Sequence, residues 1–202
     1  MDSERKLREQ RAGQVLEAWK VIVGVQMHFN DIGLRIRGLF VTILLALLAS
    51  IGFLLDKKLG FQFFGVNVQY YLLIPLFGIG GTMLFYFIDR YWFHRLLRGA
   101  VLHAIEIEKK YKAELPELSL SDAIGKESYL KPRGLLWVAS KLFVRHEGFR
   151  RDGNLHSDGK LEIFYKSVMW GLLLMSISLA LAGGITLEHK VNWKWWYFTI
   201  GV

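Results

Sequence analysis

The residues of this chain that could do chemistry lie mainly in two short polar segments, each beside an uncharged run. The segment MHFNDIGLRIRG, residues 27–38, precedes one run, and DRYWFHR, residues 89–95, follows another. Polar groups so close to lipid need partners, so the two segments predict a network between two helices. Its candidate members are His28, Asn30, Asp31, Arg35, Arg37, Asp89, Arg90, His94 and Arg95.

Asp31 and Arg35 are four residues apart, which is the spacing at which side chains pair on a helix. A network at this place either fixes the depth and register of the helices or takes part in conduction or proton transfer. We expect the structural role.

A second pattern, Arg98 followed by His103, matches the spacing found in HEPN ribonucleases. The same pattern occurs at Arg150 and Arg151 with His156, and about one match is expected by chance. Five residues of α-helix turn by about 140°, so Arg98 and His103 do not share a face. The chain has no cysteine and no HExxH, P-loop or GxSxG motif. We therefore expect no enzyme activity, no metal and no cofactor.

Three uncharged runs must position these residues, and each is close to the roughly 20 residues that cross a bilayer as a helix. They are residues 38–55, 70–88 and 167–187, in a chain that is 52% hydrophobic. The pattern predicts an all-α integral membrane protein with three transmembrane helices and long cytoplasmic helical extensions.

The basic residues predict how the chain is oriented. Of 26 Lys and Arg, 22 fall in residues 1–37 and 89–166, which places both regions in the cytoplasm. Residues 56–69 then form an external loop, and residues 188–202 an external aromatic tail, whose final run WKWWYFTIGV could equally be re-entrant or lie in the membrane interface. We expect a multi-pass protein of the bacterial inner membrane with a cytoplasmic N-terminus and the lipid bilayer as its first partner.

The cytoplasmic regions read as mostly helical. Residues 1–37 form an amphipathic helix that runs into the first span, and the second span continues as one helix to Pro116. A loop follows, with a short helix capped by Ser119 or Ser121. Residues 160–167, KLEIFYKS, lead into the third span as a short strand or as the start of its helix.

Small residues recur at helical spacing within the spans and predict close helix packing, either inside one chain or between chains. They are Thr42, Ala46 and Ser50 in the first span, Gly78 in the second, and Ser176, Ala180 and Gly184 in the third.

The strings WKVIVGVQMHFNDIGLRIRG and DRYWFHRLLRGAVLHAIEIEK lie within residues 15–112. They resemble the RipA family of octameric bacterial inner-membrane proteins. That family looks related to the membrane pore protein that accompanies some RNA-targeting CRISPR systems. The resemblance implies a homo-oligomeric ring, an octamer in that family, around an axial opening. The third span departs from a simple hairpin plan and leaves the subunit count and the pore lining open.

Together these features favour a homo-oligomeric inner-membrane protein that forms a pore or channel-like assembly and serves as an antiphage or stress effector. One alternative is a non-conducting scaffold that binds a soluble cytoplasmic partner or RNA through its basic region. We expect that region to meet anionic lipid rather than RNA. The other alternative is a membrane-tethered HEPN-like nuclease.

Overall fold

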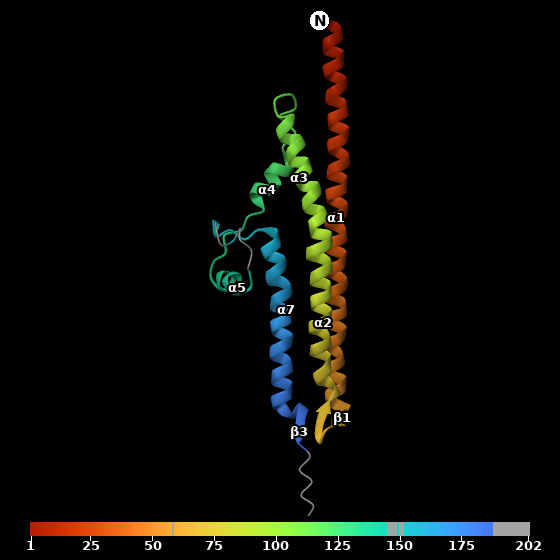
Figure 1. The fold of residues 1–202 in the computed structure, drawn as a ribbon, viewed down its shortest axis with the longest axis vertical. Coiled ribbons are helices and arrows are strands. Elements are labelled where there is room, and N and C mark those ends of the chain that lie inside the picture. Colours follow the sequence, from red (N-terminus) through yellow and green to blue (C-terminus); the bar gives the residue numbers. More distant parts are fainter. Residues whose placement is uncertain (58, 145–148, 150–151, 188–202) are drawn as a thin grey trace, which may run out of the picture.

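The computed structural model describes all 202 residues except 58, 145–148, 150–151 and 188–202. Long helices lie side by side along one axis, with the central helix contacting both others (Figure 1). The first is α1, Asp2–Lys57, and the last is α7, Ser157–Leu179. The central helix is continuous and consists of η1 Tyr70–Leu72, α2 Leu73–Phe87, η2 Ile88–Phe93 and α3 His94–Lys110.

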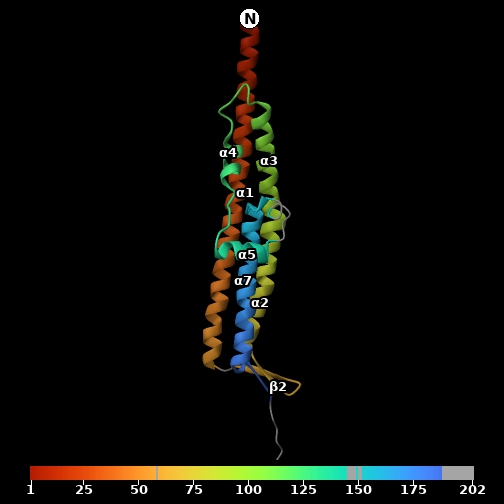
Figure 2. The same ribbon diagram turned by 90° about the vertical axis from the view of Figure 1, so that its left-hand side faces the viewer.

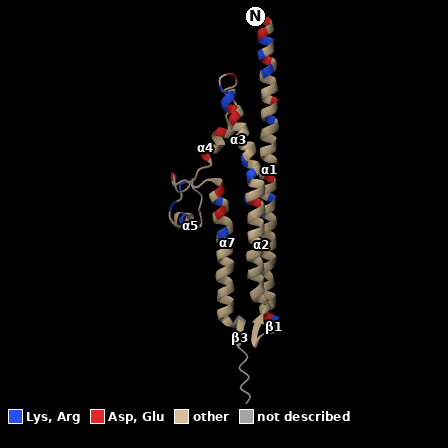
Figure 3. Cartoon of the chain, viewed as in Figure 1, with Lys and Arg blue, Asp and Glu red and all other residues tan. Residues whose placement is uncertain are grey.

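These three helices are long and apolar enough to cross a membrane. α1 runs unbroken through the predicted amphipathic helix and the first span, and its N-terminal turns extend beyond the end of α3 in both views (Figures 1 and 2). Charged residues gather on the half of the molecule that contains this N-terminus, whereas the other half is nearly free of them up to the end of α1 (Figure 3).

The remaining elements are short. Within the described part of the connection from α3 to α7 lie the helices α4, Leu120–Glu127, and α5, Leu135–Phe143, of which α5 lies across the long axis (Figures 1 and 2). The π-helix η3, Ala180–Gly184, follows α7. An antiparallel sheet in the order β1–β2–β3 closes the far end, with strands Gly60–Phe63, Val66–Gln69 and Ile185–Leu187.

The sheet corrects two sequence predictions. Residues 60–69, expected as part of a loop, form a β-hairpin, and its turn at Phe64 and Gly65 has positive φ at both residues, as a tight hairpin turn requires. The third span, expected as residues 167–187, ends in a strand rather than a helix, because the chain leaves the helix at Gly183, where φ is +103°. The predicted aromatic tail, residues 188–202, lies outside the described residues.

The helix of the third span also begins earlier than the hydropathy indicates, at Ser157 instead of Ser167. The charged residues Lys160, Glu162 and Lys166 end the uncharged run in the sequence but continue the helix. KLEIFYKS is thus helical, and the alternative of a short strand is wrong.

Two apolar clusters hold the three long helices together at different depths. One joins Phe40 of α1 to Leu161 and Tyr165 of α7. The other surrounds Ile51 of α1 and lies near the sheet. Between them α2 and α7 approach closely at Gly78, where an added Cβ would lie 3.1 Å from a methyl group of Leu172. A side chain at residue 78 would have to push Leu172 away.

At the charged end, Glu108 of α3 caps the N-terminus of α4. Its carboxylate accepts hydrogen bonds from the backbone amides of Ser121 (2.9 Å) and Asp122 (3.0 Å) and from the indole of Trp19 on α1 (3.1 Å). Ser119 occupies the N-cap position, but its side chain makes no capping hydrogen bond. The expected N-cap position at Ser119 is therefore confirmed, but the acceptor that caps the helix is a buried carboxylate from another helix and not a serine hydroxyl.

Burial raises the pKa of Glu108, but its hydrogen bonds with Ser121, Trp19 and Asp122 outweigh burial, so the pKa is lowered from 4.5. A carboxyl group whose pKa falls on folding stabilises the fold above the unfolded pKa. That stabilisation is lost as the pH falls below about 4.5 and through the lowered folded value.

We expect Glu108→Gln to loosen α4 at neutral pH by about 1–3 kcal/mol, because at least one buried donor loses its acceptor. The check is hydrogen exchange at the amides of Ser121 and Asp122, which should be about 5- to 150-fold faster in the variant. Glu106→Gln is the matched control, since Glu106 is exposed on the same helix. Equal exchange in wild type and Glu108→Gln would disprove the capping role.

Candidate functional site

All three long helices meet at one buried carboxylate. Asp89, in η2, is 1% exposed and forms a two-point ion pair with Arg37 of α1, with Nε to Oδ2 at 2.7 Å and Nη2 to Oδ1 at 3.2 Å. The hydroxyl of Tyr165, on α7, donates to Asp89 Oδ2 at 3.1 Å. This Asp89 centre fixes the relative depth of the helices, because sliding any one of them breaks a buried polar contact.

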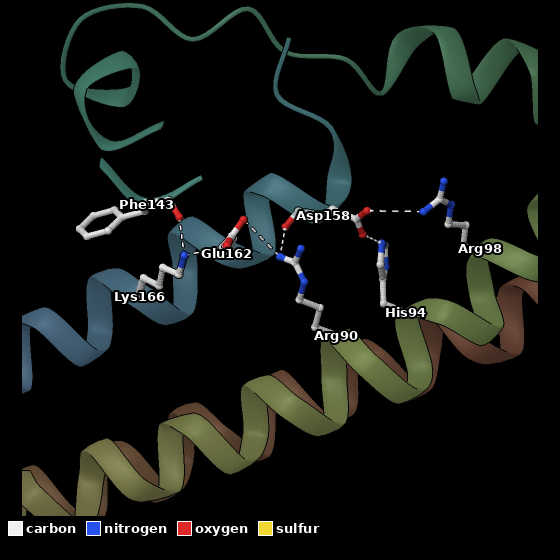
Figure 4. A network of polar contacts seen from close by, with 7 residues as sticks. All are labelled: Arg90, His94, Arg98, Phe143, Asp158, Glu162 and Lys166. Carbon is white, nitrogen blue, oxygen red and sulfur yellow. Dashed lines mark hydrogen bonds and ion pairs between the residues drawn. The ribbon is translucent and has the colours of Figure 1, made fainter. Parts of the chain in front are cut away.

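A second group of ion pairs connects the central helix to α7, closer to the start of α7 than Tyr165 (Figure 4). The guanidinium of Arg90 lies 3.3 Å from Glu162 Oε2 and donates to the carbonyl oxygen of Asp158, also at 3.3 Å. Glu162 in turn pairs with Lys166 at 2.7 Å, and the Lys166 ammonium donates to the carbonyl oxygen of Phe143 at 2.6 Å. The end of α5 is thereby attached to α7.

The third part of the network lies at the first turn of α7. His94 Nε2 is 2.5 Å from Asp158 Oδ1, and both side chains are largely buried. Arg98 Nη1 is 3.9 Å from the other oxygen of Asp158, but the Arg98 side chain is 62% exposed. Each of the three carboxylates, Asp89, Asp158 and Glu162, thus faces at least one basic side chain, which is how buried charges are tolerated.

The π-helix η2 positions the central residues. It spans Ile88–Phe93 within an otherwise α-helical segment. A π-turn adds a residue to one turn and shifts the faces of the helix that follows. Asp89 points toward α1 and Tyr165, while Arg90 and His94 contact α7. Such π-helical turns are frequent at functional sites.

The structure brings together four of the nine predicted network residues: Arg37, Asp89, Arg90 and His94. Asp31 and Arg35 pair with each other at 2.8 Å on the exposed side of α1. The other three are not in these ion pairs: His28 and Arg95 are exposed, and Asn30 lies beside a cavity with Arg37.

Sequence reasoning missed the α7 side of the network entirely. Asp158, Glu162, Tyr165 and Lys166 carry it, and none was a candidate. One signal was available, because Glu162 and Lys166 have the i,i+4 spacing of a helical pair.

The HEPN-like pair does not converge. Arg98 approaches Asp158, whereas His103 approaches Glu106 at 3.7 Å on its own helix. Among the described residues, no group of three His, Asp or Glu side chains is placed to hold a metal ion.

The small residues of the spans have different surroundings. Thr42 and Ala46 are exposed on α1, Ser50 is half-buried, and Gly78 packs on Leu172. In the third span, Ser176 and Ala180 are half-buried, and Gly184 is the last residue of η3. Of these, Gly78 packs inside the chain, and no other described residue covers Thr42 or Ala46.

Fold and site define a class: a mostly helical chain with three helices able to span a membrane and a buried ionic network that joins them. Comparison with known proteins adds no narrower assignment. No protein-family model, no curated protein and no solved structure matches the chain.

Proposed function

We propose that the chain is a homo-oligomeric inner-membrane protein whose subunits associate through one face of α1 to form a pore or channel-like assembly. One observation carries the proposal. The face of α1 opposite the other helices bears small residues at the depth of the apolar run, and the described part of the chain does not cover them. These residues are Gly38, Thr42, Ala46 and Ala49, and all four are exposed.

Along its apolar run α1 also exposes large side chains, among them Leu39, Leu45 and Phe53, so what distinguishes this helix is the row of four small residues. Exposed residues of α2 include Phe77, Leu84 and Phe87, and those of α7 include Leu174 and Leu181. Large apolar side chains suit contact with lipid, whereas small ones allow two helix backbones to approach. The row of small residues supports a neighbouring subunit on that face of α1, and we assign the outer faces of α2 and α7 to lipid.

The polar group on this face is compatible with close packing. The hydroxyl of Thr42 donates to the carbonyl oxygen of Gly38 at 3.0 Å, so it needs no partner from lipid or water. A second α1 can therefore approach without leaving a polar group unsatisfied.

The exposed pair Asp31 and Arg35 lies on the same side of α1 as the small residues. It precedes them in the sequence and is nearer the charged end of the molecule. In a ring of subunits these side chains would form charged rings at the mouth of an axial opening, and such rings select ions by charge. The resemblance of residues 15–112 to the RipA family agrees with a ring, and that family's octameric state is our proposal for the subunit count.

Orientation follows from the distribution of basic residues. The half of the molecule that carries the N-terminus and α3–α5 holds most Lys and Arg (Figure 3). We place this half in the cytoplasm of a bacterium, because basic residues are retained on that side. An antiphage or stress effector fits such an assembly, since an opened pore dissipates the membrane potential.

Planar-bilayer recordings test the proposal. We expect the purified wild type to give stepwise currents, and Arg35→Glu to shift the reversal potential toward that of cations, because each subunit exchanges a positive charge for a negative one at the mouth. Arg8→Glu, an exposed change far from the apolar run, should not shift it. The absence of current steps at every applied voltage would contradict conduction.

A further inference from the structure

A pocket of about 280 Å³ opens between the central helix and the first turn of α7. Its walls carry three arginines and one carboxylate. The lining residues are Arg90, Tyr91, His94, Arg95, Arg98 and Asp158.

The charges around this basic pocket do not cancel. Arg90 is engaged with Glu162, and the Asp158 carboxylate accepts its short contact from His94. Arg98 touches Asp158 only at 3.9 Å and is mostly exposed. Arg95 is also exposed, and among the described residues it forms no ion pair. Two guanidinium groups three residues apart on one helix thus remain available to an anion.

The position of the basic pocket relative to the apolar runs indicates where its anion resides. The uncharged run of the second span ends at Ile88, and the pocket begins at Arg90. From Arg90 to Arg98 the helix rises about 12 Å. The headgroup region on each side of a bilayer is about 5–8 Å thick, so the pocket begins within it.

Aromatic residues mark the same depth. Tyr91 lines the pocket and is 52% exposed, and the neighbouring Trp92 is 60% exposed. Exposed tyrosine and tryptophan at the end of a span are typical of the membrane–water interface.

We propose that the basic pocket binds the phosphate group of an anionic phospholipid, with Arg95 and Arg98 as its main ligands. Guanidinium groups form charge-assisted, often bidentate hydrogen bonds with phosphate, and basic pockets between membrane helices suit anionic headgroups. The Tyr91 hydroxyl supplies a further donor. The inference rests on the membrane placement of the proposed function but not on assembly or conduction, since a single subunit contains the whole pocket.

Lipid titration of the full-length protein in detergent, followed by native mass spectrometry, tests this site. The probes are phosphatidylglycerol, phosphatidylcholine, and inorganic phosphate as the soluble source of the same chemistry. We expect preferential retention of phosphatidylglycerol. Arg95→Gln with Arg98→Gln should weaken it about tenfold or more. Arg5→Gln with Arg8→Gln removes two exposed arginines at the same spacing from α1 and should change it less than about twofold.

A pair of lysine substitutions distinguishes loss of the binding site from misfolding of the glutamine variant. Arg95→Lys with Arg98→Lys retains both charges but loses the bidentate guanidinium geometry, so it should bind phosphatidylglycerol more tightly than the glutamine pair and less tightly than wild type. The site would be overturned if wild type retained phosphatidylcholine as well as phosphatidylglycerol. It would also be overturned if the Arg5 and Arg8 control lost as much phosphatidylglycerol binding as the Arg95 and Arg98 variant. Competition by inorganic phosphate at the same concentration as the lipid would overturn the lipid assignment in favour of a free anion. The oligomer mass in the same spectra reports separately on the proposed function.

Discussion

Changing Asp89 to Asn is expected to lower the free energy of unfolding by about 3 kcal/mol, because removing one partner of a buried ion pair leaves the other uncompensated. The amide of Asn cannot accept both guanidinium contacts of Arg37, and its NH2 group is a donor that faces other donors. The hydroxyl of Tyr165, which is fully buried, also loses its charged acceptor. Unfolding in mixed detergent micelles, followed by circular dichroism, measures the loss.

Asp31→Asn is the matched control for this change. Like Asp89, Asp31 pairs with an arginine, in this case Arg35 on the same helix. Both side chains are exposed, however, and exposed pairs contribute only about 0–1 kcal/mol. The Arg37→Gln variant and the Asp89→Asn, Arg37→Gln double variant complete a cycle, in which the two single losses should not add. Additive losses, or an Asp89→Asn variant as stable as Asp31→Asn, would show that the Asp89 centre does not join the helices.

The sequence was sufficient for two of the three helices that position this centre, α1 and the central helix. Uncharged runs long enough to cross a bilayer indicate which residues lie in lipid, and the charged residues at their ends indicate where the membrane surface lies. Arg37 and Asp89 could be proposed as partners on that basis, because each lies next to the end of a run. Hydropathy indicates whether a segment lies in lipid or in water, but it does not indicate which other helix the segment contacts. The contribution of α7 through Tyr165 was therefore not visible.

The same limit explains the missed start of α7. From the sequence, Glu162 and Lys166 are expected to lie outside the third membrane span, just before its first residue, since charged residues are costly in lipid. In the fold both are largely buried and paired, Glu162 with Arg90 and Lys166 with the Phe143 carbonyl, so the helix continues through them. Glu108 was missed for a related reason: its role as a cap depends on where α4 lies, which no spacing along the chain shows.

The strands near residue 60 were missed because their signals are short. β1 and β2 have four residues each, and β2 also pairs with β3, a strand more than 100 residues further along the chain. The turn at Phe64 and Gly65 contains a glycine, but phenylalanine is not a residue that favours positive φ. The hairpin depends on pairing that the local sequence only weakly specifies.

Ala46→Phe is expected to dissociate the assembly. The change places a large ring on the small-residue face of α1, where close approach of a second helix depends on small side chains. Overpacking costs about 1–3 kcal/mol at a contact, and in a ring the cost recurs at every subunit. Since Ala46 is exposed within its own chain, the fold of the single subunit should be unaffected.

Leu174→Phe is the control, because Leu174 is 60% exposed on α7 at a face we assign to lipid. The deciding measurement is the mass of the detergent-solubilised particle for wild type and both variants. We predict a particle of several subunits for wild type and Leu174→Phe, and a monomer with unchanged helix content for Ala46→Phe. A monomeric wild type, or an Ala46→Phe particle of wild-type mass, would contradict assembly through this face of α1.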